Sequence, residues 1–240
     1  MRWGKLFNDG WEFAKQVLTE TKNEEVPSVF VPVEIPHDWL IYDSYNLYQD
    51  SIGWYRKSFM HEKKPGKQYF LRFDGIYMDS TIYINGNTAC EWKYGYSSFV
   101  LDVTGFLKEG VNEILVKAVY HSPNSRWYSG AGIYRNIWFQ EVDPVWLIQD
   151  GIYISEREEQ NGNWRVTVSA EIGVKQQTDP RDITLRFQVF KRRGNTNKNT
   201  AGMDTVYSSS QFSNYEEDIT DGQEPIAECL AGAAVIHEKK

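Results

Sequence analysis

Short runs of β-branched and aromatic residues recur along this chain, and Gly, Asn, Asp and Pro break them every few positions. Val, Ile, Tyr, Phe and Trp favour strands, whereas the residues that break the runs favour turns. No segment carries the 3.6-residue period of an amphipathic helix over three turns. With 41% hydrophobic and 15% aromatic residues, the chain has enough apolar side chains for a packed core. The pattern therefore predicts an all-β protein built as a sandwich.

One hairpin can be located to the residue. Ile82 and Ile84 alternate with Thr81 and Tyr83, and Asn85-Gly86 follows directly. That dipeptide readily adopts positive φ at both central positions, as the tight turn of a hairpin requires. The other elements predicted in this part of the chain are a strand in which Tyr69, Leu71 and Phe73 alternate with polar residues except at Phe70, one short helical turn at 102–107, and long strands at 111–120 and 133–142.

A domain boundary is predicted at Asp143-Pro144, because Pro cannot donate to a strand ladder and tends to lie between elements. From Trp164 to Ile172, apolar and polar residues then alternate as in a half-buried strand. The remaining expectations are a strand at 151–155, a strand in which Leu185, Phe187 and Val189 alternate with polar residues, a long polar loop at 194–225 and a returning strand at 227–236. We therefore expect one domain at residues 1–145 and a second at 146–240.

Charge and composition argue against several classes of function. A net charge of −7 disfavours a nucleic-acid partner, since phosphate binding requires a basic face, and the basic cluster Lys191–Arg193 is expected to be a solvated loop. No apolar run approaches the length of a membrane span, so no membrane association is expected. No apolar signal-peptide core follows the first residues, and Cys90 and Cys229 fit a reducing compartment better than a disulfide framework. These features predict a cytoplasmic location.

The stretch Ser125–Arg135 combines a guanidinium, two adjacent aromatic rings and two spaced glycines within eleven residues. An aromatic ring offers a flat apolar face to the C–H side of a sugar, and a guanidinium offers a rigid fork of donors to its hydroxyls. The same residues also suit a tight corner between strands, with Trp127 and Tyr128 buried in the core. Composition alone leaves these two interpretations about equal.

Further motifs accompany this stretch in a fixed order along the chain. They are Asn8–Phe13, Ile35–Trp39, Gly53–Phe59, Phe73–Ser80, Tyr83–Gly86, Gly95–Phe99, Asp102–Thr104 and Gly110–Ile114. Together with Ser125–Arg135 they resemble the N-terminal part of family 2 glycoside hydrolases, and most closely the β-galactosidase branch. The resemblance is strong over residues 6–150 and rests on pattern alone from residue 151 onward.

The resemblance implies a jelly-roll sugar-binding sandwich followed by an immunoglobulin-like sandwich, and it leaves open whether the second is complete. It also implies a retaining enzyme whose two catalytic glutamates lie in a (β/α)8 barrel after the second domain. A barrel needs about 250 residues, so we expect this chain to be the non-catalytic front of such an enzyme and to be inactive alone. The acidic pair in Asn23-Glu24-Glu25 lies outside that catalytic context. No cofactor and no metal are expected, because the four histidines lack the spacing of metal ligands.

Three residues are the candidates for sugar binding. In the family, the jelly roll reaches over the barrel mouth and contacts the sugar, and the matching positions here are Asp38 and Arg126. A carboxylate accepts from hydroxyls and a guanidinium donates to them. The alternative roles for Asp38 are forming a turn or holding Arg126 in place. Asp50 matches an asparagine that contacts substrate in some members. The residues expected to shape the walls of the site rather than to bind are His37, Trp39, Trp127 and Tyr128.

Several functions remain open at this level. The leading one is the N-terminal portion of a retaining β-galactosidase that contributes one wall of the sugar subsite. The expected partners are then a terminal β-galactoside and the catalytic barrel of the parent chain, with a homo-oligomer of the parent left open. The alternatives are the same portion of a β-glucuronidase or β-mannosidase, a free-standing carbohydrate-binding module, and an interaction scaffold.

Overall fold

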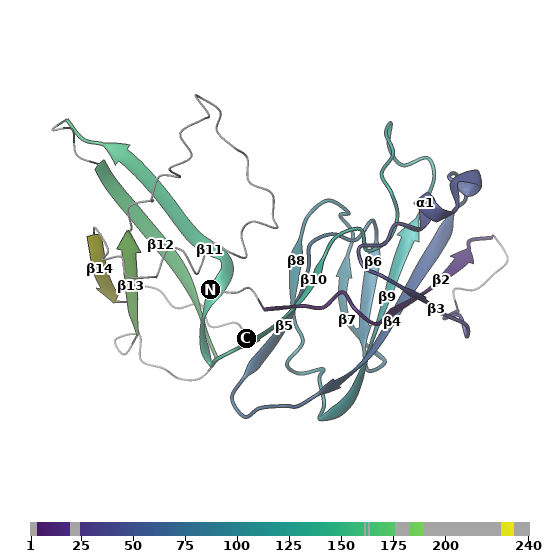
Figure 1. Ribbon diagram of the computed structural model, residues 1–240, viewed down its shortest axis with the longest axis horizontal. Helices are drawn as coiled ribbons and strands as arrows, with labels where there is room; N and C mark the ends of the chain where they lie inside the picture. Colours follow the sequence, from purple (N-terminus) through teal and green to yellow (C-terminus); the bar gives the residue numbers. More distant parts are fainter. Residues whose placement is uncertain are drawn as a thin grey trace, which may run out of the picture. The chain divides into compact units, whose positions relative to one another are not determined.

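The computed structural model describes residues 4–19, 25–160, 162, 164–175, 183–189 and 227–232. The chain divides into two compact units, Arg2–Asp143 and a second that begins at Pro144 (Figure 1). The all-β prediction, a jelly-roll sandwich followed by an immunoglobulin-like sandwich, is confirmed as the fold class. The predicted domain bounds, a sugar-binding jelly roll at 1–145 and an immunoglobulin-like domain at 146–240, stay a prediction.

The first unit is a sandwich of two antiparallel sheets. The six-stranded sheet contains, in spatial order, β3 (Val31–Val33), β2 (Trp11–Val17), β4 (Ser51–His61), β9 (Gly110–Tyr120), β6 (Ser80–Ile84) and β7 (Asn87–Trp92). The four-stranded sheet contains β1 (Lys5–Leu6), β10 (Ile137–Val142), β5 (Gln68–Phe73) and β8 (Phe99–Asp102). Most neighbouring strands are not consecutive in sequence, so the chain crosses repeatedly between the two sheets, as in a jelly roll.

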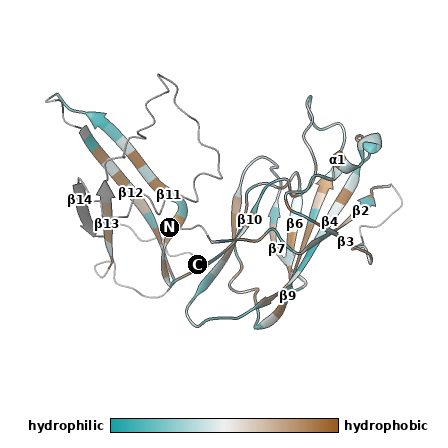
Figure 2. Cartoon of the chain, viewed as in Figure 1, coloured by the Kyte–Doolittle hydropathy of each residue, from teal (hydrophilic) through white to brown (hydrophobic). Residues whose placement is uncertain are grey.

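The core lies between the sheets and follows the predicted alternation. Tyr69, Leu71 and Phe73 of β5 are fully buried, and Ile82 and Ile84 of β6 are buried while their neighbours are half-exposed. Figure 2 shows the hydrophobic positions along these strands. A smaller cluster of Ile52, Trp54 and Val119 is packed separately. Successive side chains of a strand point to opposite faces. The first five residues of β4 are all buried, so both faces of the sheet are covered there.

The predicted Asn85-Gly86 hairpin is confirmed between β6 and β7. Asn85 has φ 50° and Gly86 has φ 81°, the left-handed conformations that the tight turn requires. The Asn85 side chain donates to the carbonyl of Phe106 at 2.9 Å and thereby ties the hairpin to the 102–107 segment. That segment forms the single predicted turn, in which the Leu107 N–H donates to the Val103 carbonyl.

Two strand boundaries were predicted wrongly. The strand predicted at 151–155 is longer in the structure and runs over Val145–Glu158. β10 begins at Ile137 and not at residue 133. The backbone of 131–133 instead bonds to the 37–39 segment, with the His37 N–H donating to the Ile133 carbonyl at 2.7 Å, and Gly132 exchanges two hydrogen bonds with Tyr77. This segment is therefore extended but serves to hold two loops together.

Two two-stranded antiparallel sheets are described in the second unit. They are β11 (Val145–Glu158) with β12 (Trp164–Val174), and β13 (Thr184–Val189) with β14 (Ala227–Gly232). Along β12, Ile172 is buried and Val168 half-buried as expected, but Val166 is 49% exposed, so the predicted half-buried strand holds only for its second half. The predicted loop at 194–225 and the last residues of the predicted strand at 227–236 lie outside the described residues.

Helices are short in the described part of the chain. They are α1 (Trp39–Tyr42) and the 3-10 turn η1 (Ser44–Asn46). Neither approaches the length or the hydrophobicity that a membrane-crossing helix needs.

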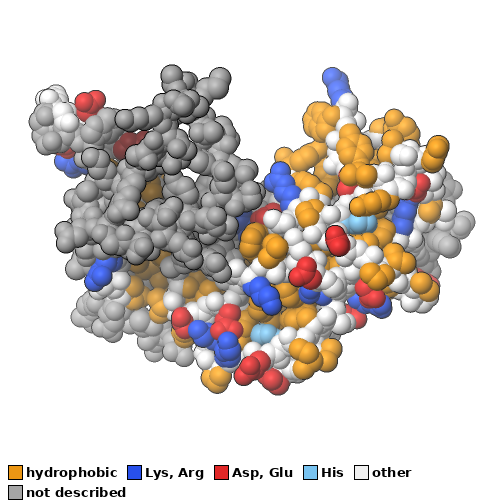
Figure 3. Space-filling view, in the orientation of Figure 1, with side chains coloured by type: hydrophobic (Ala, Val, Ile, Leu, Met, Phe, Trp, Pro, Cys, Tyr) orange, Lys and Arg blue, Asp and Glu red, His pale blue; other side chains and the backbone are white. Residues whose placement is uncertain are grey.

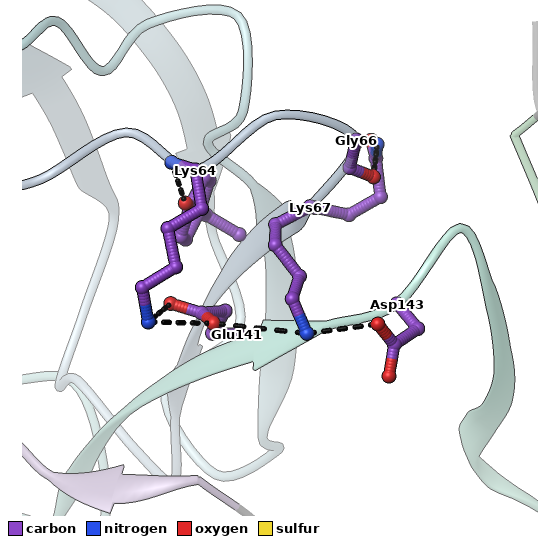
Figure 4. Close-up of polar contacts among 7 residues, drawn as sticks. Lys64, Gly66, Lys67, Glu141 and Asp143 are labelled. Atoms are coloured by element: carbon purple, nitrogen blue, oxygen red, sulfur yellow. Dashed lines mark hydrogen bonds and ion pairs between the residues drawn. The ribbon is translucent and has the colours of Figure 1, made fainter.

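Ion pairs surround the end of β10, where the first unit ends. Lys64 contacts Glu141 at 3.0 Å, and Lys67 lies between Glu141 at 3.8 Å and Asp143 at 2.8 Å (Figure 4). The Asp143 side chain is 72% exposed, so its pair with Lys67 is screened by water and stabilises the fold by little. The hydrogen bond to Asp143 raises the pKa of Lys67, which stays charged throughout the physiological range.

Candidate functional site

The loop between β9 and β10, residues 121–136, and the segment of α1 and η1 lie at the same end of the first unit (Figure 1). Between them is a hollow of about 340 Å³. On the visible face, hydrophobic side chains gather over this end of the unit (Figure 3). The residues that line the hollow are Leu40, Leu47, Tyr48, Tyr120, Ser122, Pro123, Asn124, Ser125, Arg126, Trp127, Tyr128 and Ser129. This lining combines aromatic rings with small polar groups, as small-molecule sites do.

Asp38 joins the two sides of this site. One carboxylate oxygen accepts from the Leu40 N–H at 3.0 Å and so caps the start of α1, and it also accepts from the Ala131 N–H at 2.9 Å. The other oxygen accepts from the Tyr128 hydroxyl at 2.7 Å. Burial and this hydrogen bond together raise the pKa of Tyr128, which therefore keeps its proton and donates. The turn-forming role for Asp38 is present, and its contact with a sugar stays a prediction.

Arg126 lines the hollow and is exposed. Its guanidinium forms no hydrogen bond or ion pair with the residues that the structure describes, so the alternative in which Asp38 holds Arg126 is not observed. Asn124 lies beside it in the lining, with its oxygen accepting from the Ser129 hydroxyl at 3.0 Å. The Asn124 Nδ2 is buried and has no acceptor in the described part of the chain. The Arg126 guanidinium is therefore a donor group that a ligand can reach, whereas the Asn124 Nδ2 is covered.

Asp50 does not line the hollow, although it contacts a residue that does. Its carboxylate accepts from the Ser122 N–H at 2.7 Å and pairs with His121 Nδ1 at 3.0 Å. These two hydrogen bonds, the one with His121 first, lower the pKa of Asp50. The structure therefore gives Asp50 a role in fixing the start of the 121–136 loop.

Trp127 and Tyr128 are 66% and 57% exposed and line the hollow, so the interpretation of these rings as core is wrong, and their role in the wall of a sugar site stays a prediction. His37 and Trp39 were expected in the wall as well, but both are buried, at 7% and 2% exposure. The His37 ring packs against Phe13 and Tyr55, and the Trp39 ring stacks on Phe13, so both side chains lie in the interior.

Gly132 permits the close approach of this loop to the core. It has φ 115°, and a Cβ there would overlap the hydroxyl of Tyr55 and the carbonyl of His37. Gly130 has φ 71°, and a Cβ there would lie 2.6 Å from the Asp38 carboxylate. The two glycines singled out in the sequence are thus required by the backbone that carries the site.

Sequence reasoning missed two contributors. Tyr48 lines the hollow, and the exposed tyrosines at 42, 45 and 48 recur every third residue, which was an available signal. Tyr96 contacts the site through its hydroxyl, which accepts from the Trp127 indole N–H at 3.0 Å. No sequence pattern connects Tyr96 with Trp127, because the two residues are 31 positions apart. Among the described residues, no three His, Cys, Asp or Glu side chains gather as metal ligands would.

Comparisons with known proteins identify the fold and the family. The family model "Glycosyl hydrolases family 2, sugar binding domain" matches residues 18–143, which is more than half of the chain. The β-galactosidase BoGH2A of Bacteroides ovatus is 38% identical over 136 residues, which cover 51% of this chain and 16% of that protein. A putative β-glucuronidase of Formosa agariphila is 33% identical over 179 residues, which cover 69% of this chain and 17% of that protein.

The solved structure of a β-glycosidase from Bacteroides vulgatus superposes with a TM-score of 0.61 at 26% identity, covering 77% of this chain and 25% of that one. The fold is a jelly-roll β-sandwich with an aromatic hollow at one end. The chain belongs to glycosyl hydrolase family 2, and the matched region is its sugar-binding domain. It spans about a sixth of the length of the two curated relatives.

Proposed function

We propose that this chain is the N-terminal sugar-binding portion of a retaining family 2 β-galactosidase, in which the hollow beside residues 121–129 forms one wall of the subsite for a terminal β-galactoside. The observation that carries the proposal is an exposed guanidinium in an aromatic lining. Arg126 has no acceptor among the described residues and lines the hollow. The rings of Trp127, Tyr128 and Tyr48 supply the apolar faces that a sugar needs.

In this proposal the residues of this chain do not cleave the glycosidic bond. A retaining glycosidase needs two carboxyl groups about 5–5.5 Å apart. The Asp38 carboxylate, which accepts from Tyr128 of the lining, is already bonded to two backbone N–H groups and this hydroxyl. We assign it to positioning Tyr128 and to accepting from a sugar hydroxyl with its remaining lone pair. The catalytic barrel of the parent enzyme would supply both catalytic groups and the opposite wall.

A β-glucuronidase is the second candidate, and one observation favours it. Among the described residues the Arg126 guanidinium has no partner carboxylate, and guanidinium–carboxylate pairs are bidentate and strong. A uronic acid would bring such a carboxylate, whereas galactose brings only hydroxyls. The relative from Formosa agariphila is a putative β-glucuronidase, in line with this alternative.

Kinetic measurements on the barrel-containing protein separate the two candidates. The coding sequence after Lys240 is read first, to check that it encodes the barrel. We expect a higher kcat/KM for 4-nitrophenyl β-D-galactoside than for the matching β-D-glucuronide. The reverse preference would establish the second candidate. The 240-residue chain alone should show no turnover of either compound. A stop codon at this position, together with measurable glycan binding, would favour a free-standing binding module instead.

A further inference from the structure

Three exposed aromatic rings lie together at the rim of the hollow. Trp127 is 66% exposed, Tyr94 is 63% exposed and Tyr96 is 39% exposed. The rings of Tyr94 and Tyr96 are 5.8 Å apart at an interplanar angle of 67°, and the Trp127 indole donates to the Tyr96 hydroxyl. Exposed aromatic surface that gathers in one place marks a binding surface more often than scattered apolar residues do.

These rings are held in place by the core beneath them. The Tyr96 ring meets the ring of Tyr77, which is 4% exposed, edge to face at 5.2 Å. The Gly95 carbonyl accepts from the Tyr134 hydroxyl at 2.8 Å. A Cβ at Gly95 would overlap the Tyr77 ring, so only glycine lets the chain pass so close. The exposed faces are therefore preorganised, and a ligand that stacks on them loses little entropy in ordering the protein.

The position of the rings indicates what they would bind. Trp127 lines the hollow, whereas Tyr94 and Tyr96 do not, so the group continues outward from it. The faces are apolar and uncharged, and the tyrosine hydroxyls can donate and accept at the edges. That combination matches a pyranose ring, which has an apolar C–H face and hydroxyls around its rim.

We propose that Trp127, Tyr96 and Tyr94 form a platform for a second sugar ring, so that the site recognises a β-linked oligosaccharide rather than a single terminal sugar. This inference rests on the proposed function, because it takes the hollow as the place of the first sugar. Trp127 is the stacking residue. Tyr96 positions it through the hydrogen bond to the indole N–H.

The test is a titration of the 240-residue chain with two probes, methyl β-D-galactoside and β-1,4-galactotetraose, followed through the indole N–H signals in ¹H–¹⁵N NMR spectra. The tetrasaccharide should bind the wild type more tightly than the methyl glycoside. Trp127→Ala should weaken tetrasaccharide binding about tenfold, which corresponds to about 1.4 kcal/mol, and weaken methyl glycoside binding by much less, although Trp127 also lines the hollow. Tyr96→Phe keeps the ring but removes the acceptor, so it should give a smaller loss. Tyr153→Ala is the matched control, because Tyr153 is 67% exposed and belongs to the second unit.

Three outcomes would overturn the platform. They are an unchanged tetrasaccharide affinity in Trp127→Ala, an equal loss for both probes, and no binding of the tetrasaccharide to the wild type. If Trp127→Ala instead lowers the stability of the barrel-containing protein without affecting glycan binding, the rings contact protein and the platform is refuted. None of these results decides the proposed function, which is judged separately from the substrate preference of the barrel-containing protein and its response to Arg126→Lys.

Discussion

Replacing Asp38 tests whether one carboxylate holds the two sides of the site together. In the structure it accepts from the backbone N–H groups of Leu40 and Ala131 and from the hydroxyl of Tyr128. Losing an N-cap costs about 0.5–2 kcal/mol, and losing a hydrogen bond to a neutral group costs about 0.5–1.5 kcal/mol. Asp38→Ala removes one N-cap and two further hydrogen bonds, and water partly replaces the more exposed of these. The free energy of unfolding should therefore fall by about 2–4 kcal/mol.

Urea denaturation followed by tryptophan fluorescence measures this loss, because Trp11 and Trp39 are buried in the core of the first unit. The midpoint should fall while the slope stays at its wild-type value. A double-mutant cycle between Asp38→Asn and Tyr128→Phe should give a coupling of about 1 kcal/mol for their shared hydrogen bond. A loss below about 0.5 kcal/mol in Asp38→Ala would refute the reasoning, because surface substitutions without a structural role fall in that range.

Three further predictions concern the same region. Arg126→Lys keeps the charge but loses the planar fork of donors. The kcat/KM of the barrel-containing protein should therefore fall about tenfold to a hundredfold, with an unchanged thermal midpoint. A fully active variant would remove Arg126 from the site. Gly132→Ala should lower the free energy of unfolding in urea by about 3 kcal/mol, because Gly132 has a positive φ and a Cβ would overlap a buried hydroxyl. Gly105→Ala is the control and should be near neutral, because there is open space around Gly105. Asp50 has a lowered pKa in the folded state, so it stabilises the fold above its unfolded pKa and this contribution disappears as the pH falls through the folded value. Wild type should therefore have a higher thermal midpoint than Asp50→Asn at pH 7, and the two should converge in acid; a constant difference at every pH would contradict the role of the charge.

The strands that the sequence located best are those whose burial is decided by local alternation. Ile82 and Ile84 with the Asn85-Gly86 turn needed no information from elsewhere, because side-chain period and turn chemistry fix them. The start of β10 was missed because residues 131–133 have the composition of a strand but form hydrogen bonds with two loops. Burial of Val166 was misjudged for a similar reason, since alternation shows which side chains share a face but not how far that face is covered.

For the site, the resemblance predicted Asp38, Arg126 and Asp50 as sugar-binding residues, and these roles stay predictions. Sequence spacing could not show that the hydroxyl of Tyr96 meets the indole of Trp127, because that contact depends on two loops meeting in space. For the same reason it could not show that the Asp50 carboxylate accepts from the backbone N–H of Ser122.

The 121–136 loop is fastened near both ends, by Asp50 at Ser122 and by Asp38 at Ala131. Neither fastening depends on the identity of the side chain at the loop residue, because both use a backbone N–H. Gly130 between them is fixed, since it has a positive φ and a Cβ there would meet the Asp38 carboxylate, but residues 123–129 can vary without moving the strands on either side. A protein engineer can therefore exchange this short segment while the two aspartates hold its ends in place.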